Sequence, residues 1–388
     1  MHLGKKRIYL DWASATPVSM RARSAFEQAL RFDGNPSAPH TEGRAAKKIL
    51  EDARTTIARL AEVKTEGVIF TSGATEANNL ALSGYIQALR AKNPTQKLHV
   101  LYLPTAHASV IETVKMLSWY GVEVEPLTVS EGAVDVQVLS TQVRSDTVLV
   151  TVDAVCGETG IRYDTRDIRR TLDAIRSGIV LHVDASQLPR IAPFELTRLG
   201  ADLLTLDAQK VGGVRGIGAL IVRHGVELSP ILHGGGQEQG MRPGTEVPAL
   251  AMSFAEALTE TKEQRDSFHD RADVARTELI AKISAVIPDV QINEGKQQAP
   301  HILNLSFPGR DTDYAVAVLD TAGFAVSTKS ACETDAEGSR VITLLTGDAE
   351  RAASTLRISW GSSTTPRDMA RFATELIRTI RFLDAHRL

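Results

Sequence analysis

An acid and a lysine stand at the ends of two apolar runs in the middle of the chain. Residues 179–183 lead into Asp184, and residues 202–206 lead through Asp207 into Lys210. Mostly apolar runs of this length are typical of buried parallel strands. Because the carboxyl ends of such strands form the ligand crevice of an open α/β sheet, we expect Asp184 and Lys210 to face one bound molecule.

This pair suits the chemistry of pyridoxal 5'-phosphate. The cofactor needs an amine that forms a Schiff base with its aldehyde, and a carboxylate that keeps the pyridine nitrogen protonated. The competing interpretation is that Asp184 caps a turn and Lys210 is a solvated loop residue, and the pair taken alone favours it. The rest of the chain must therefore decide.

Further polar groups follow other predicted strands. A strand at 68–71 leads into Ser72–Thr75 and a helix, which predicts either a phosphate site at the helix start or an ordinary cap at Thr75. His107 follows the strand at 98–103, where it could form a structural hydrogen bond or stack on an aromatic ligand. Each signal is weak by itself.

Composition excludes several functional classes. The chain has 388 residues and a formal net charge of -3, so it has no basic stripe for nucleic acid and no polybasic membrane patch. It has no apolar run near the roughly 18 residues of a membrane span and no apolar core of a signal peptide, so we expect a cytoplasmic protein. Its two cysteines, Cys156 and Cys332, are far apart, so we expect neither a disulfide nor a metal site.

Strands and helices alternate through most of the chain, which predicts an α/β fold with a mainly parallel, doubly wound sheet. We expect a large domain at 15–255 and a smaller α+β domain at 1–14 and 256–388. The smaller domain carries the polar segment KSACETDAEGSR, which contains Cys332. Free cysteine is usually buried, so a thiol in such a segment is atypical.

Taken together, these segments resemble the cysteine desulfurases, which belong to the class V aminotransferase group of pyridoxal phosphate enzymes with fold type I. The resemblance runs nearly end to end. It rests on YLDWASATPV, NPSAPHTEGR, TSGATEANN, HVDASQ, QKVGGVRGIGAL, HGGGQEQGMRPGT, HILNLSF, KSACET and LRISWG. The order of so many matches makes the signal strong.

The resemblance implies the catalytic residues. It gives Lys210 as the Schiff-base lysine, Asp184 as the partner of the pyridine nitrogen, and Cys332 as the nucleophile. His107 would stack on the cofactor ring and serve as the local acid or base. For the substrate carboxylate, the resemblance implies Asn35 and Arg357.

The remaining cofactor contacts are implied in the same way. Gln187 would contact the phenolic oxygen, and Ala74 and Thr75 would hold the phosphate. Thr245 would reach that phosphate from the other subunit of a homodimer, which is therefore expected.

Three positions depart from the family pattern. Gly157 stands where the family has asparagine, and Asp207 and Gln209 stand where it has serine and histidine in contact with the cofactor. A carboxylate pointing at a phosphate would be repelled by roughly 4 kcal/mol per pair of unit charges at about 4 Å. We therefore expect the Asp207 carboxylate to turn toward a backbone amide or a cation such as Arg215.

The implied activity is conversion of L-cysteine to L-alanine, with the sulfur held on Cys332 as a persulfide. The sulfur would then serve iron–sulfur cluster assembly or tRNA thiolation through an acceptor protein. The alternatives are another class V enzyme, namely a selenocysteine lyase or an aminotransferase, and a non-catalytic homologue that acts as a binding protein.

Overall fold

The computed structural model describes residues 7–328 and 338–385. The chain divides into two compact units, each built from segments that are separate in sequence. The large unit comprises 17–155 and 163–264, and the small unit comprises 1–16, 156–162 and 265–388.

The large unit is built on a mostly parallel sheet, as the sequence predicts. Within the described residues its seven strands lie in the order β2 (Val68–Thr71), β10 (Gly218–Val222), β9 (Leu203–Asp207), β8 (Val180–Asp184), β7 (Thr147–Asp153), β3 (His99–Tyr102) and β4 (Glu123–Pro126). Strand β10 runs antiparallel to both of its neighbours, and the other pairs are parallel. Strands β2, β3, β7, β8 and β9 therefore end at one edge.

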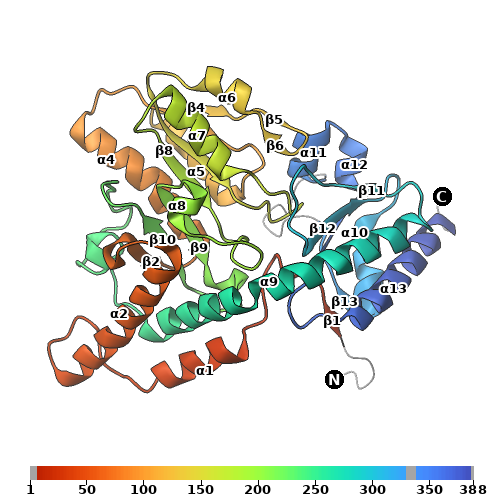
Figure 1. Ribbon diagram of the computed structural model, residues 1–388, viewed down its shortest axis with the longest axis horizontal. Coiled ribbons are helices and arrows are strands. Elements are labelled where there is room, and N and C mark those ends of the chain that lie inside the picture. The colour runs from red at the N-terminus through yellow and green to blue at the C-terminus, as the bar shows by residue number, and fades with distance from the viewer. Residues whose placement is uncertain (1–6, 329–337, 386–388) are drawn as a thin grey trace. The chain divides into compact units, whose positions relative to one another are not determined.

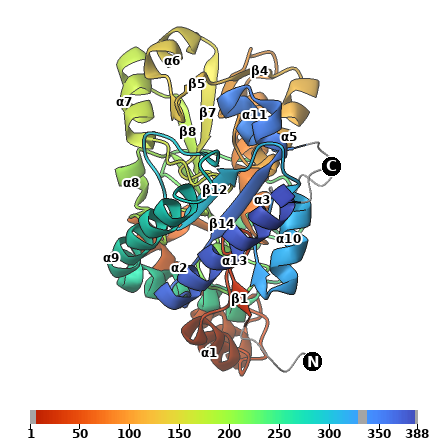
Figure 2. The same cartoon turned by 90° about the vertical axis from the view of Figure 1, so that its right-hand side faces the viewer.

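Helices cover both faces of this sheet. They are α1 (Met20–Ala29), α2 (Thr41–Ala61), α3 (Ala74–Asn79), α4 (Tyr85–Lys92), α5 (Ala108–Trp119), α6 (Val136–Gln142), α7 (Thr165–Ile175) and α8 (Leu196–Leu199), with a short hairpin of β5 (Val129–Ser130) and β6 (Ala133–Val134). Figure 2 shows α7 and α8 on one face and α3 and α5 on the other. This cover explains why every residue of β7, β8 and β9 is buried.

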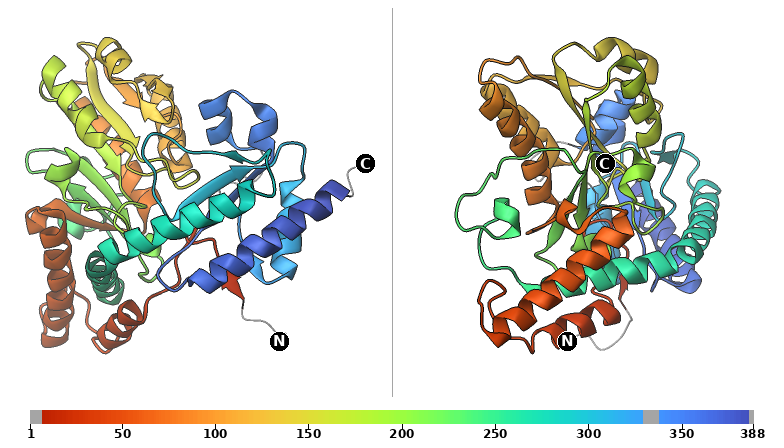
Figure 3. Two further views of the ribbon diagram at one scale, coloured as in Figure 1. Left: turned by 45° about the vertical axis from the view of Figure 1, so that its right-hand side comes forward. Right: turned by 60° about the vertical axis from the view of Figure 1, so that its left-hand side comes forward.

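Helix α9 (Pro248–Ser284) has 37 residues. The chain has neither glycine nor proline between 249 and 284 to stop it. Arg21 of α1 forms ion pairs with Glu256 and Glu263 of α9, and the two helices lie side by side in Figure 3.

The small unit has its own antiparallel sheet and helices, drawn mostly in blue in Figure 1. The sheet order is β11 (Gln291–Ile292), β12 (Ile302–Ser306) and β14 (Thr355–Ser359), and β1 (Ile8–Tyr9) pairs in parallel with β13 (Phe324–Ala325). Helices α10 (Thr312–Thr321), α11 (Arg340–Thr346), α12 (Ala349–Ala353) and α13 (Pro366–Ala385) complete the unit.

The unit boundaries differ from the expected 15–255 and 256–388 in one instructive way. Residues 156–162, between β7 and α7, belong to the small unit. Their backbone is bonded there: Ala299 N–H donates to Gly160 O (2.7 Å) and Arg162 N–H donates to Gln297 O (3.0 Å). Backbone hydrogen bonds between segments so far apart in the sequence leave no local sequence pattern.

Residues 7–328 and 338–385 contain neither a helix able to span a membrane nor a cluster of metal ligands. No helix there combines the length and the apolar character that crossing a bilayer requires. No group of three or more histidine, cysteine, aspartate or glutamate side chains there is arranged to hold a metal ion.

Candidate active site

Asp184 and Lys210 lie at the carboxyl edge of the large sheet. Strands β8 and β9 are parallel neighbours, with Asp184 opposite Thr205 in the register. Asp184 is the last residue of β8, and Lys210 ends the single 3₁₀ turn that follows β9. Both groups therefore reach the edge where open α/β sheets bind ligands.

The Asp184 carboxylate is buried and held by three donors. Its Oδ1 accepts from the Ser186 N–H (2.9 Å) and the Ser186 hydroxyl (2.6 Å), and its Oδ2 accepts from Asn78 Nδ2 (2.8 Å). A carboxylate offers about four acceptor positions, so one remains on Oδ2 among the described contacts. One further N–H donor, such as a protonated pyridine nitrogen, fits that position.

A neutral histidine lies two residues before Asp184 on the same strand. His182 Nδ1 lies 2.8 Å from the Thr151 hydroxyl and Nε2 lies 3.1 Å from the Thr205 hydroxyl, so both ring nitrogens are bonded to neighbouring strands. Burial lowers the pKa of His182 to about 4, although the charge of Asp184 acts in the opposite direction. At neutral pH His182, which lies next to Asp184 on the same face of the sheet, is therefore uncharged.

His107 is the N-cap of α5 and is exposed. Its backbone N–H donates to Asp153 Oδ2 (3.3 Å), which fixes it at the end of β7. Its Nδ1 accepts from the Ser109 N–H (3.1 Å) and lies 2.8 Å from the Ser109 hydroxyl. Asn78 Nδ2 donates to that same hydroxyl (2.9 Å), so hydrogen bonds connect His107 with Asp184.

The start of α3 is where the phosphate of the cofactor is expected to bind. Gly73, with φ +153°, is the N-cap, so the alternative of a cap at Thr75 is wrong. A Cβ at Gly218 of β10 would lie 2.7 Å from the backbone of Gly73, so only glycine there lets this turn approach the sheet.

Asp207 accepts hydrogen bonds at this same turn. Its Oδ2 accepts from the Ala74 N–H (3.1 Å) and from Gln209 Nε2 (3.3 Å), and its Oδ1 accepts from the Gln209 N–H (3.0 Å). The carboxylate thus turns to backbone amides, one of the two outcomes expected, and these bonds do not involve Arg215. The Ala74 amide is, however, one that the resemblance assigns to the phosphate. The residues therefore fit the cofactor at its ring end, and at its phosphate end a carboxylate competes for one donor.

Gln187, another expected cofactor contact, is buried in the turn that follows β8. Thr75 is the second residue of α3 and is exposed. Asn35 is exposed between α1 and α2, and its side-chain oxygen accepts from the Ser37 N–H (2.9 Å) in a local turn.

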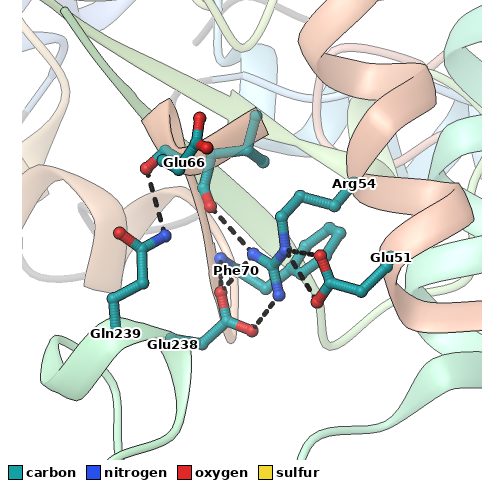
Figure 4. Close-up of polar contacts among 7 residues, drawn as sticks. Glu51, Arg54, Glu66, Phe70, Glu238 and Gln239 are labelled. Carbon is teal, nitrogen blue, oxygen red and sulfur yellow. Dashed lines mark hydrogen bonds and ion pairs between the residues drawn. The ribbon is translucent and has the colours of Figure 1, made fainter. Parts of the chain in front are cut away.

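The glycine-rich loop that carries Thr245 is anchored by a buried ion pair, shown in Figure 4. Arg54 of α2 donates to both oxygens of Glu238 (2.6 and 2.7 Å), and Glu238 also accepts from the Phe70 N–H (2.8 Å) of β2. The guanidinium lies 4.8 Å from the centre of the Phe70 ring. Gln239 Nε2 donates to Glu66 O (3.1 Å).

The same loop is bonded to α3 a few residues later. Arg242 Nε donates to Glu76 (3.1 Å), and the other oxygen of Glu76 accepts from the Ser72 N–H (2.8 Å). Thr245 follows this contact and is exposed. The loop is therefore held at two points, while Thr245 itself faces outward.

Arg357 belongs to the small unit. Its Nη2 donates to Asp11 (2.8 Å) and its Nη1 donates to Gly157 O (3.0 Å), and the residue is 4% exposed. Glycine at 157 contributes only its backbone to this contact, where the family has an asparagine side chain.

The structure describes only one of the two cysteines. Cys156 is buried in the small unit, and burial raises the pKa of its thiol to about 11. It is therefore protonated and unreactive at neutral pH. Cys332, the expected nucleophile, lies outside the described residues.

A cavity of about 1000 Å³ lies at the opposite edge of the large sheet. Its lining includes Gly67, Ile179, Asp202 and Val222, which are at the start of β2, β8 and β9 and the end of β10. None of the expected site residues lines it within the described part of the chain. Its size alone does not connect it with the chemistry of Asp184 and Lys210.

Sequence analysis missed Asn78 and Ser109, which join Asp184 to His107. Asn78 is fully buried in a helix whose neighbours Ala77, Leu80 and Ala81 are apolar and buried. A polar residue on an apolar helix face needs a bonded partner, so this pattern was the available signal. Ser109 gave none, because serine is common in the first turn of a helix.

Comparisons with known proteins agree with this geometry. Residues 8–372 match the model of the family described as aminotransferase class V. Cysteine desulfurase IscS 1 of Archaeoglobus fulgidus is 34% identical over 367 residues, covering 94% of each chain. Cysteine desulfurase IscS of Pectobacterium carotovorum subsp. carotovorum is 36% identical over 384 residues, covering 96% of this chain and 92% of the relative.

Solved structures give the same result. One described as a NifS-like protein superposes with a TM-score of 0.91 at 28% sequence identity, covering 97% of this chain and all of the other. DndA from Streptomyces lividans superposes with a TM-score of 0.76 at 30% identity, covering 93% of this chain and 99% of the other. The match over nearly the whole length shows that this chain belongs to the class V aminotransferase family of pyridoxal-phosphate-dependent enzymes.

Proposed function

We propose that this protein is a cysteine desulfurase, which converts L-cysteine to L-alanine and transfers the sulfur to Cys332 as a persulfide. The observation that carries the proposal is the placement of Asp184 and Lys210 at one edge of the sheet. The supporting comparison is with relatives named cysteine desulfurase at 32–36% identity. The reaction balances without an added oxidant, because the C–S bond of cysteine breaks as the S–S bond to Cys332 forms, and the carbon keeps the bonding electrons and takes a proton to become the methyl group of alanine.

Each residue then has a definite task. When bound, the cofactor supplies an electron sink for the charge that develops at the substrate Cα. Asp184 holds the pyridine nitrogen as N–H, and Lys210 binds the aldehyde carbon and moves the Cα proton. Asn35 and Arg357 keep the role that the resemblance gives them at the substrate carboxylate.

Sulfur transfer is assigned to Cys332 rather than Cys156. The buried thiol of Cys156, with its pKa of about 11, has almost no thiolate at neutral pH. Cys332 lies in a polar segment of sequence, KSACETDAEGSR, which suits an accessible thiol. From there the sulfur would pass to an acceptor protein of iron–sulfur cluster assembly or tRNA thiolation.

The test measures alanine and persulfide formed from L-cysteine by purified protein loaded with pyridoxal phosphate. Lys210→Ala and Cys332→Ser are expected to abolish product, and Cys156→Ser is the matched thiol control that should retain it. Borohydride reduction followed by peptide mapping should place the cofactor on Lys210. Loss of product in Cys156→Ser with full product in Cys332→Ser would refute the assignment.

A homodimer is part of the proposal. Thr245 is exposed at the end of a loop anchored by Glu238 and Arg242, so it is presented away from its own subunit. Sedimentation at the concentration of the activity assay should give a dimer. An active monomer would show that Thr245 does not complete a phosphate site across an interface.

One observation favours a second candidate, a non-catalytic homologue that acts as a binding protein. Asp207 accepts from the Ala74 amide expected at the cofactor phosphate. The visible absorption spectrum of the purified protein separates the two candidates, because protein that binds no cofactor when pyridoxal phosphate is supplied would favour the second.

A further inference from the structure

A chain of hydrogen bonds runs across the candidate site from Asp184 to His107. Asn78 Nδ2 lies 2.8 Å from Asp184 Oδ2 and 2.9 Å from Ser109 Oγ, and Ser109 Oγ lies 2.8 Å from His107 Nδ1. The members come from β8, α3 and the start of α5. Asn78 is fully buried and Ser109 is nearly so. Water therefore does not screen the middle of this chain.

The chemistry of the groups fixes the direction of every hydrogen. The Asp184 carboxylate only accepts, so Asn78 must present its NH₂ group there, and its second N–H points to Ser109 Oγ. This orientation leaves Asn78 Oδ1 buried with no hydrogen-bond partner among the described residues. A flipped amide would instead place that oxygen against the carboxylate. The two donor contacts thus outweigh one unsatisfied acceptor.

The contacts between Ser109 and His107 determine which ring nitrogen of His107 carries the proton. The Ser109 backbone N–H donates to His107 Nδ1 (3.1 Å), so Nδ1 carries a lone pair and no proton. The Ser109 hydroxyl, which already accepts from Asn78, can then donate its own hydrogen to the same nitrogen. Two donors converge on Nδ1, and the proton of the neutral ring lies on Nε2.

We propose that Asn78 and Ser109 are positioning residues that hold His107 as the neutral tautomer with its proton on Nε2. In that form Nε2 donates a hydrogen bond and has no lone pair with which to take a proton. His107 at rest is then a hydrogen-bond donor toward a ligand and not a general base. The meaning of this state for catalysis rests on the proposed function, but the tautomer itself does not.

The test is NMR spectroscopy of the full-length protein with ring-¹⁵N histidine, at a pH near 8.5, where free histidine is neutral. The chain has 10 histidines, and the His107→Gln spectrum identifies the signal of interest. The wild-type ring is expected to show an unprotonated Nδ1 and a protonated Nε2. Ser109→Ala keeps the backbone donor and loses the hydroxyl, so the tautomer ratio should fall roughly fivefold, as for loss of one neutral hydrogen bond.

Three further variants make the result specific. Ser109→Thr keeps a hydroxyl and should restore the wild-type ratio. Asn78→Ala removes the donor that fixes the Ser109 hydroxyl, so it should shift the ratio in the same direction as Ser109→Ala but by less. Ser83→Ala is the matched control, because Ser83 is also buried but its hydroxyl has no hydrogen-bond partner among the described residues.

Either of two results would overturn the proposal. One is a wild-type ring protonated on Nδ1. The other is a ratio that Ser109→Ala leaves unchanged, or that Ser83→Ala changes by the same factor. Because the spectra need neither substrate nor turnover, absence of desulfurase activity with an intact tautomer would count against the proposed function alone.

Discussion

Replacing Asp207 with serine is expected to tighten the binding of pyridoxal phosphate. The Asp207 carboxylate accepts from the Ala74 N–H at 3.1 Å and is 5% exposed, so it lies where a phosphate oxygen would accept. If it stayed, two unit charges about 4 Å apart would repel by about 4 kcal/mol at an effective dielectric constant of about 20. If it moved, it would lose a charge-assisted hydrogen bond worth about 1.5–3 kcal/mol.

The smaller of these two costs sets the expected effect. Asp207→Ser removes this cost. The dissociation constant for pyridoxal phosphate should therefore fall about 10- to 100-fold, since about 1.4 kcal/mol corresponds to a factor of ten. Asp207→Asn removes the charge and keeps the shape, so it should give a smaller gain. Gln209→His, added to Asp207→Ser, should tighten binding further through a second donor.

The assay titrates cofactor-free protein with pyridoxal phosphate and, separately, with pyridoxal, which lacks the phosphate. The affinity for pyridoxal should be the same in the parent and in Asp207→Ser. Urea unfolding serves as the control for folding, because Asp207 also caps the turn at Gln209; serine caps about as well, so the free energy of unfolding should change little in Asp207→Ser. Unchanged or weaker binding of pyridoxal phosphate, or an equal gain for pyridoxal, would refute the reasoning.

Three other outcomes are expected. Glu238→Gln leaves a buried guanidinium without its counter-ion and should lower the free energy of unfolding by about 3–5 kcal/mol in urea, whereas Glu51→Gln, at the exposed partner, should cost under about 1 kcal/mol. His182 stays neutral in the folded protein down to about pH 4 and takes a proton near its ordinary pKa of 6.5 when unfolded. The free energy of unfolding should therefore fall by about 3 kcal/mol as the pH drops through this interval, and His182→Asn should flatten the fall measured by urea unfolding at each pH. Iodoacetamide at about pH 8 should leave Cys156 unlabelled in the native protein and label it in urea, and mass spectrometry of peptides checks this.

The sequence by itself determined the sheet and its functional edge. The apolar runs at 179–183 and 202–206 lie within one residue of β8 and β9. These strands are buried on both faces, so their residues are mostly apolar, with His182 and Thr205 as polar exceptions. Asp184 follows the first run directly and Lys210 lies four residues after the second, so their common edge could be predicted from local pattern and the parallel rule alone.

Only the tertiary structure decided how the polar side chains at that edge are bonded. Asn78 meets Asp184 across 106 positions of sequence, and Asp207 meets Ala74 across 133. The assignment of residues 156–162 to the small unit likewise depends on bonds to residues near 299. Periodicity reports which face of an element is buried, but the direction of a hydrogen bond depends on partners that other elements bring, and no local pattern encodes them.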